Sequence, residues 1–175
     1  MLVEDLMTHN VEACGPDASL AEAAAVMWRR DCGVVPVVGE GGRPVGVITD
    51  RDICMALATR RAYASDVRVS EVMSRDVATC LHVDDVREAL EVMREHQFNR
   101  LPVVNGEGRL VGILSVGDVV RRTRKGKGKR RVSRKDTLAT LRAIRRPRAG
   151  EGSAAEDDEE DDEATVEEEA GGDAA

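Results

Sequence analysis

The chain has 175 residues, and its charges are divided into three blocks: residues 1–120 carry 19 acidic and 12 basic side chains, residues 121–148 carry 14 basic and one acidic, and residues 149–175 carry 13 acidic and no basic. About 120 residues suffice for one packed core, so we expect a folded unit followed by a basic segment and an acidic tail. No apolar run reaches the ~20 residues of a membrane span, and the opening MLVEDLM lacks the basic start and apolar stretch of a secretory signal, which predicts a cytoplasmic protein without a membrane partner.

The first predicted elements are a short extended piece at Val11–Cys14 and a helix that begins after Ser19, a plausible N-cap. Leucine, alanine and methionine then recur at helical spacing and predict one buried stripe: Leu20, Ala23, Ala24 and Met27. A β-rich run follows at Val34–Val38, and its proline favours an edge strand or a strand end. A glycine-rich turn connects this run to Val45–Ile48, which predicts a hairpin. A second helix is expected to begin at Thr49.

Residues 58–68 form a connector, after which the same series of elements is predicted again. Shifting the chain by 66 residues aligns positions 3–53 with 69–119 without a gap, and 16 of the 51 pairs are identical. Such self-similarity at a fixed period marks a duplicated structural unit. One β-α-β-β-α unit cannot bury both faces of its small sheet, so two copies should pack together about a pseudo-twofold axis as an α/β fold.

The chain is therefore divided into a first motif at residues 1–60 and a second motif at residues 61–122. Residues 123–148 are expected to be a basic linker with a short helix, which a capping box at Ser133–Asp136 would open and which would place Leu138, Leu141 and Ile144 on one face. Residues 149–175 are expected to be a disordered acidic tail.

Each unit ends with a hydroxyl residue and, three positions later, a carboxylate: Thr49 with Asp52, and Ser115 with Asp118. One reading of this pattern is a capping box, in which both residues only stabilise a helix start. The other reading is a ligand site, because a helix N-terminus suits a phosphate and a carboxylate can accept hydrogen bonds from the two hydroxyls of a ribose.

These residues carry a resemblance to a known family. The Gly-h-h-Thr/Ser-x-x-Asp endings (h, apolar), the Pro-Val-Val strands before them, the DLM and EVM openings and the duplication resemble the cystathionine-β-synthase-type (CBS) motif over residues 3–122, and two tandem copies are similar to a Bateman module. The resemblance implies two clefts between the motifs for AMP, ADP, ATP, S-adenosylmethionine or an NAD-type ligand. It also implies that Thr49 and Asp52 serve one cleft, and Ser115 and Asp118 the other.

The resemblance further implies which residues flank the ligand. The adenine would lie near the backbone at Val11–Ala13 and Val77–Thr79 and near the strands entering Pro36 and Pro102. Two arginines suit phosphate contact. Arg51 stands in the first copy where the second has Gly117, and Arg100 stands in the second where the first has Val34. Both arginines could equally be solvated surface residues.

No catalytic or metal-binding pattern accompanies these motifs. The four cysteines and three histidines lack metal-ligand spacing, so we expect free buried or half-buried thiols, no metal and no catalytic cofactor. A nucleophile turn and a phosphate-loop lysine are also missing from the sequence, which predicts that the chain is not an enzyme. A homodimer that regulates a client protein is the function that the resemblance implies. The alternative is a nucleic-acid-associated protein whose basic arm, residues 121–148, makes weak contacts that the acidic tail inhibits.

Overall fold

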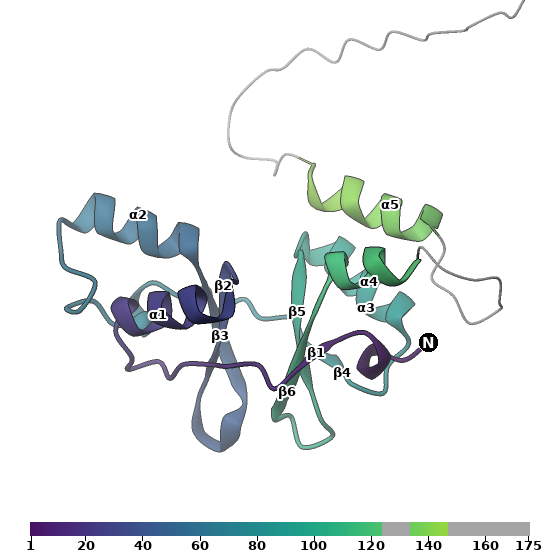
Figure 1. Cartoon of the computed structure of the whole chain (residues 1–175), viewed down its shortest axis with the longest axis horizontal. Helices are drawn as coiled ribbons and strands as arrows, with labels where there is room; N and C mark the ends of the chain where they lie inside the picture. The colour runs from purple at the N-terminus through teal and green to yellow at the C-terminus, as the bar shows by residue number, and fades with distance from the viewer. Residues whose placement is uncertain (124–133, 147–175) are drawn as a thin grey trace, which may run out of the picture.

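The computed structural model describes residues 1–123 and 134–146. Two similar halves lie side by side (Figure 1), with their hairpins facing each other across the middle of the molecule and their helices on the outer sides. The first half contains α1 (Leu20–Arg30), β2 (Val34–Val38), β3 (Pro44–Thr49) and α2 (Asp50–Arg60). The second half contains α3 (Val86–His96), β5 (Arg100–Val104), β6 (Leu110–Ser115) and α4 (Val116–Thr123). The predicted repeat is confirmed as two copies of one α/β unit.

The helices begin where the sequence predicts. The side chain of Ser19 accepts a hydrogen bond from the Glu22 backbone N–H (3.2 Å), while the Glu22 carboxylate accepts one from the Ser19 N–H (2.7 Å). Asp85 caps α3 by accepting from the Arg87 N–H at 2.9 Å. Side-chain capping of this kind satisfies backbone donors that the first helical turn leaves unpaired.

Both hairpins have the same register, with Pro36 opposite Val47 and Pro102 opposite Ile113. The sheet of the second half has the order β1-β6-β5-β4, in which β1 is Thr8–His9 and β4 is Cys80–Leu81. Strand β5 is therefore internal and Pro102 lies in its middle, so the expectation that proline marks an edge strand or a strand end is wrong for it. Proline is tolerated there because β4 pairs with Val103 and Val104 and not with Pro102. The backbone N–H that Pro102 lacks would therefore have had no hydrogen-bond partner in β4.

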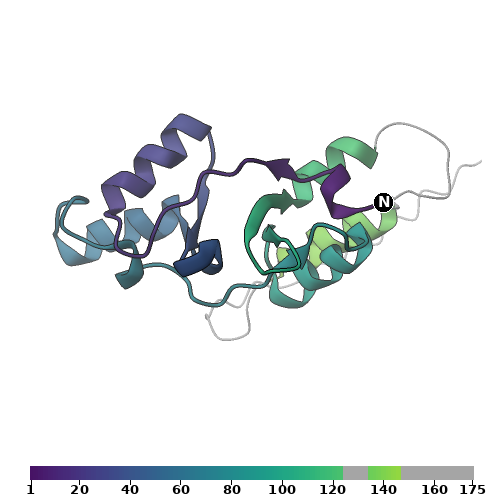
Figure 2. The ribbon, with the colours of Figure 1, turned by 90° about the horizontal axis from the view of Figure 1, so that it is seen from below.

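The first residues of the chain pack on the second half rather than on the first. A 3₁₀ turn at Val3–Asp5 places Val3 in the hydrophobic core of the second half, and Thr8 in β1 pairs with Ile113 in β6. Figure 2 shows the N-terminal segment running along the second half before it crosses to α1. The second half is thus completed by residues that precede the first half in the sequence.

The segment after the connector, residues 69–74, makes the reciprocal exchange. A 3₁₀ turn at Val69–Glu71 places Val69 in the core of the first half, and Ser74 forms a bridge with Val47 in β3. A shift of 66 residues relates this bridge to the pairing of Thr8 with Ile113. The two halves therefore hold each other through their exchanged segments.

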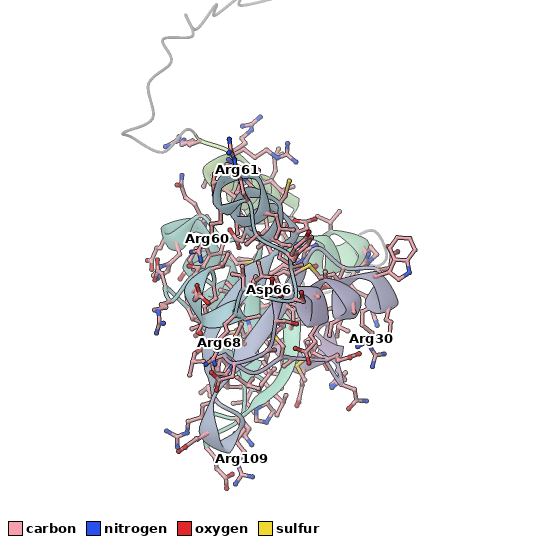
Figure 3. The ribbon with its side chains drawn as sticks, turned by 90° about the vertical axis from the view of Figure 1, so that its left-hand side faces the viewer. Arg30, Arg60, Arg61, Asp66, Arg68 and Arg109 are labelled. Atoms are coloured by element: carbon pink, nitrogen blue, oxygen red, sulfur yellow. The ribbon has the colours of Figure 1, made fainter. Side chains whose placement is uncertain are left out.

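Ion pairs fasten the connector to the outer end of the first half, where Figure 3 shows Arg60 and Arg68. The Arg60 guanidinium lies 2.9 Å from the Glu71 carboxylate, and the Arg68 guanidinium lies 3.1 Å from that of Asp17. All four side chains are well exposed to solvent, so each pair contributes well under about 1 kcal/mol. The exchange is held mainly by its buried side chains.

A further helix, α5 (Arg134–Ile144), packs against α3 and α4. Leu141 and Ile144, which were predicted to share one face of this helix, pack on the core of the second half. Leu138, however, is 49% exposed, and the predicted face is wrong at this position because Thr137 and Thr140 are buried instead. The Thr140 hydroxyl donates to the Asp136 carbonyl at 2.9 Å, which satisfies it inside the helix. The predicted cap at Ser133, most of the basic segment between α4 and α5, and the acidic tail lie outside the described residues.

All four cysteines are free thiols. Burial raises the pKa of Cys14, and it raises the pKa of Cys80 to about 12. Cys54 is exposed, which corrects the expectation that every thiol is at least half-buried. Across the described residues, no helix is long and apolar enough to cross a membrane, and no group of three or more potential metal ligands is present.

Candidate functional site

A cleft of about 630 Å³ lies between the halves and is lined by both of them. The first half supplies Val34 and Val47 from its hairpin and Thr49, Arg51 and Asp52 from the start of α2. The second half and α5 supply the remaining lining residues: Asp76, Val77, Ala78, Gln97, Phe98, Asn99, Arg100, Pro102, Ile113, Ile144 and Arg146. The cleft therefore has apolar walls made by the hairpins and a polar end made by a helix start.

Thr49 and Asp52 form the capping box that the sequence predicts. The Thr49 backbone N–H and hydroxyl both donate to Asp52 Oδ2, at 2.9 and 2.7 Å, and the Asp52 N–H donates to Thr49 Oγ1 at 3.1 Å. Only one carboxylate oxygen is used in this way. Within the described part of the chain, Oδ1 of Asp52 has no hydrogen-bond partner, so it can accept hydrogen bonds from a molecule in the cleft.

The equivalent capping box at the start of α4 differs in the hydrogen bonds that its carboxylate accepts. The Ser115 N–H and hydroxyl donate to Asp118 Oδ2 at 2.9 and 2.6 Å, but Arg121 donates to Oδ1 of the same carboxylate. The position that corresponds to Arg121 in the first half is Met55, which cannot make this bond. Asp118 therefore has both oxygens occupied, whereas Asp52 has one oxygen available.

Arg51 and Arg100 line the same cleft, although they belong to different copies of the repeat. They converge because the start of α2 in one half faces β5 in the other. The corresponding positions in the other copy of the repeat are Gly117 and Val34, so each copy supplies one of the two arginines.

Of the residues expected to contact a ligand, six line this cleft: Thr49, Arg51, Asp52, Val77, Arg100 and Pro102. The others do not line it: Val11, Ala13, Pro36, Thr79, Ser115 and Asp118. Five of these six are the counterparts, 66 residues away in the repeat, of residues expected on this side of the two halves. The sixth, Thr79, lies one position beyond the lining residue Ala78.

Asp76, Asn99, Ile144 and Arg146 also line the cleft and were not predicted from the sequence. Asp76 directly precedes Val77 and could have been included with it. The position of Arg146 follows only from the docking of α5, for which the repeat gives no signal.

The comparisons agree with this architecture. The family model of the CBS domain matches residues 3–59 and again residues 69–125. The CBS domain-containing protein YhcV of Bacillus subtilis (strain 168) is 37% identical over 117 residues, which are 67% of this chain and 81% of YhcV.

Two solved structures of CBS proteins are similar to this one. The CBS domain pair of protein MJ0100, in complex with 5′-methylthioadenosine and S-adenosyl-L-methionine, has a TM-score of 0.62 and 30% identity and covers 70% of this chain and 94% of that one. CBSX2 in complex with AMP has a TM-score of 0.58 and 27% identity and covers 69% of this chain and 94% of that one. With both family matches lying on the two structural halves, the chain belongs to the CBS-domain family and carries two CBS domains in tandem.

Proposed function

We propose that the chain is a non-catalytic regulatory module that binds an adenosine-containing ligand in the cleft between its CBS domains and so modulates a client protein. The observation that carries this proposal is the free Oδ1 of Asp52 in a cavity of about 630 Å³ that three arginines also line. A volume of this size is typical of small-molecule sites. The adenosine ligands in the MJ0100 and CBSX2 structures support the same class of ligand here.

Different cleft residues suit different parts of an adenosine-containing ligand. Val77, Pro102 and Ile113 provide apolar surface on which an adenine can pack. Asp52 accepts hydrogen bonds from the ribose hydroxyls, and the N-terminus of α2 with Arg51 and Arg100 faces the phosphate. A ligand held by both halves changes their relative orientation. A client protein that contacts both halves can respond to that change.

A thermal-shift series on the full chain tests this function. Adenosine, AMP, ADP, ATP, S-adenosylmethionine and NADH are compared with UMP, which has a ribose and a phosphate but no adenine. At 100 times its dissociation constant a ligand stabilises the folded state by ~2.7 kcal/mol, which raises the melting temperature by several degrees. We expect an adenosine ligand to do so and UMP to have little effect. Unchanged melting with every adenosine ligand at millimolar concentration would contradict the proposal.

We also propose that two copies associate through the outer face of α1 and α2. Trp28 on α1 is 89% exposed and borders a hollow that contains Met27 and Ile53. The equivalent face of the second half, on α3 and α4, is covered by α5. The charged residues Asp31, Asp50 and Arg100 also line this hollow, and an exposed apolar patch among polar residues is typical of an interaction site.

Light scattering on the full chain tests this association. We expect twice the 19.0 kDa mass of one chain, and a lower average mass for Trp28→Ser. Tyr63→Ser is the matched control because Tyr63 is an aromatic residue, 80% exposed, in the connector, and this variant should stay dimeric. A monomeric wild-type protein at micromolar concentration, or equal behaviour of the two variants, would exclude this interface.

A further inference from the structure

The C-terminal helix reaches the ligand cleft although it lies outside the two CBS domains. Ile144, the last residue of α5, and Arg146, which follows it, both line the cavity together with Arg51 and Arg100. Three arginines thus line one cleft, each from a different part of the chain: the start of α2, the start of β5 and the segment after α5. Within the described residues, none of the three forms an ion pair.

The end of α5 is held in place by a side chain that belongs to the cleft itself. The Gln97 amide Nε2 donates to the Ala143 carbonyl at 3.2 Å and to the Arg146 carbonyl at 3.4 Å. Gln97 is the C-cap of α3 and adopts a left-handed conformation (φ 54°). The next three residues, Phe98 to Arg100, line the cleft as well. The position of Arg146 is therefore fixed from the same short segment that a ligand would contact.

The same contacts reduce the electrostatic repulsion between the C-terminus of α5 and an anionic ligand. A helix C-terminus has a partial negative charge that repels an anion, and the C-terminus of α5 is next to the cleft. The Gln97 amide caps two of the carbonyls there, and Arg146 adds a full positive charge. The end of α5 is thus made compatible with a phosphate.

The charges along the cleft favour a highly anionic ligand. Opposing the three guanidiniums are two carboxylates, Asp52 and Asp76, and one oxygen of Asp52 already accepts the capping hydrogen bonds. A nucleoside diphosphate or triphosphate can be contacted by several arginines at once, whereas the extra positive charge of a sulfonium ligand such as S-adenosylmethionine is repelled by them.

We infer that the cleft selects an adenine nucleotide with a polyphosphate chain and that Arg146 is one of its phosphate-binding residues. This inference rests on the proposed function, because it names the ligand of that site. It also makes the docking of α5 and the binding of the polyphosphate mutually dependent, since each supplies contacts that favour the other. A nucleotide in the cleft thereby stabilises α5 against α3 and α4.

Calorimetric titration of the full chain with adenosine, ADP and S-adenosylmethionine tests the inference. Wild type should bind ADP at least ~10-fold more tightly than the other two ligands, a difference of about 1.4 kcal/mol. Arg146→Gln should weaken ADP binding by roughly 10-fold and change adenosine binding by less than about twofold. Arg145→Gln is the matched control: Arg145 is adjacent and exposed but does not line the cleft, so its loss should change neither affinity.

The outcomes separate this inference from the function on which it rests. If adenosine and ADP bind wild type equally well, or if Arg146→Gln and Arg145→Gln bind ADP alike, the polyphosphate role of Arg146 is excluded and the adenosine site remains. Tighter binding of S-adenosylmethionine than of ADP excludes it in the same way. If neither adenosine nor ADP binds, the proposed function fails and this inference fails with it.

Discussion

Replacing Gly112 with alanine is expected to lower the free energy of unfolding by about 1–3 kcal/mol, the usual cost of overpacking a tight site. A Cβ at Gly112 would lie 2.7 Å from the sulfur of Met7 and 2.8 Å from the Thr8 carbonyl oxygen. The methionine side chain can move, but the carbonyl cannot, because Thr8 is paired with Ile113 in the sheet. Gly112 is the point where the exchanged N-terminal segment crosses β6.

Gly46→Ala should have a similar cost, because its Cβ would lie 2.9 Å from the Ser74 carbonyl oxygen, where the segment after the connector crosses β3. Gly106→Ala is the matched control, since nothing lies within 4 Å of a Cβ there, and its effect should stay within about 0.5 kcal/mol. Urea denaturation of the three variants measures these differences. A midpoint for Gly112→Ala equal to that of Gly106→Ala would show that the exchanged segment does not pack as described.

The local elements could be predicted because their signals are local. The start of α1 depends on Ser19 and Glu22, three residues apart, and the hairpins depend on short aliphatic runs on either side of glycine-rich turns. Because the unit is repeated, each element was predicted twice, from two different stretches of the sequence. The capping reading and the ligand reading of Thr49 and Asp52 are also compatible, because one oxygen of Asp52 forms the cap and the other remains available.

What the sequence left open depends on contacts between distant parts of the chain. The convergence of Arg51 and Arg100 requires the two halves to face each other, and no spacing within one repeat reveals this. The same holds for Arg146, which reaches the cleft only because α5 docks on α3 and α4. By contrast, the pairing of Arg121 with Asp118 could have been anticipated, because residues three apart on a helix are neighbours.

The second large effect is expected at Asp52. Asp52→Ala should weaken adenine nucleotide binding by roughly 10- to 100-fold, because a hydrogen bond to a charged group contributes about 1.5–3 kcal/mol. Asp118→Ala removes a carboxylate with the same capping hydrogen bonds, so both variants should lose about 1 kcal/mol of folding stability. Asp118 does not line the cleft, and its second oxygen is bound by Arg121. Its replacement should leave nucleotide affinity nearly unchanged.

Calorimetric titration of ADP into wild type, Asp52→Ala and Asp118→Ala therefore tests most directly whether the cleft between the CBS domains is the ligand site. Melting curves of the same samples show whether both variants are folded. The expected result is a large loss of ADP affinity for Asp52→Ala and a change of less than about threefold for Asp118→Ala. Wild-type affinity in Asp52→Ala, or an equal loss in both variants, would contradict the assignment of the site to this cleft.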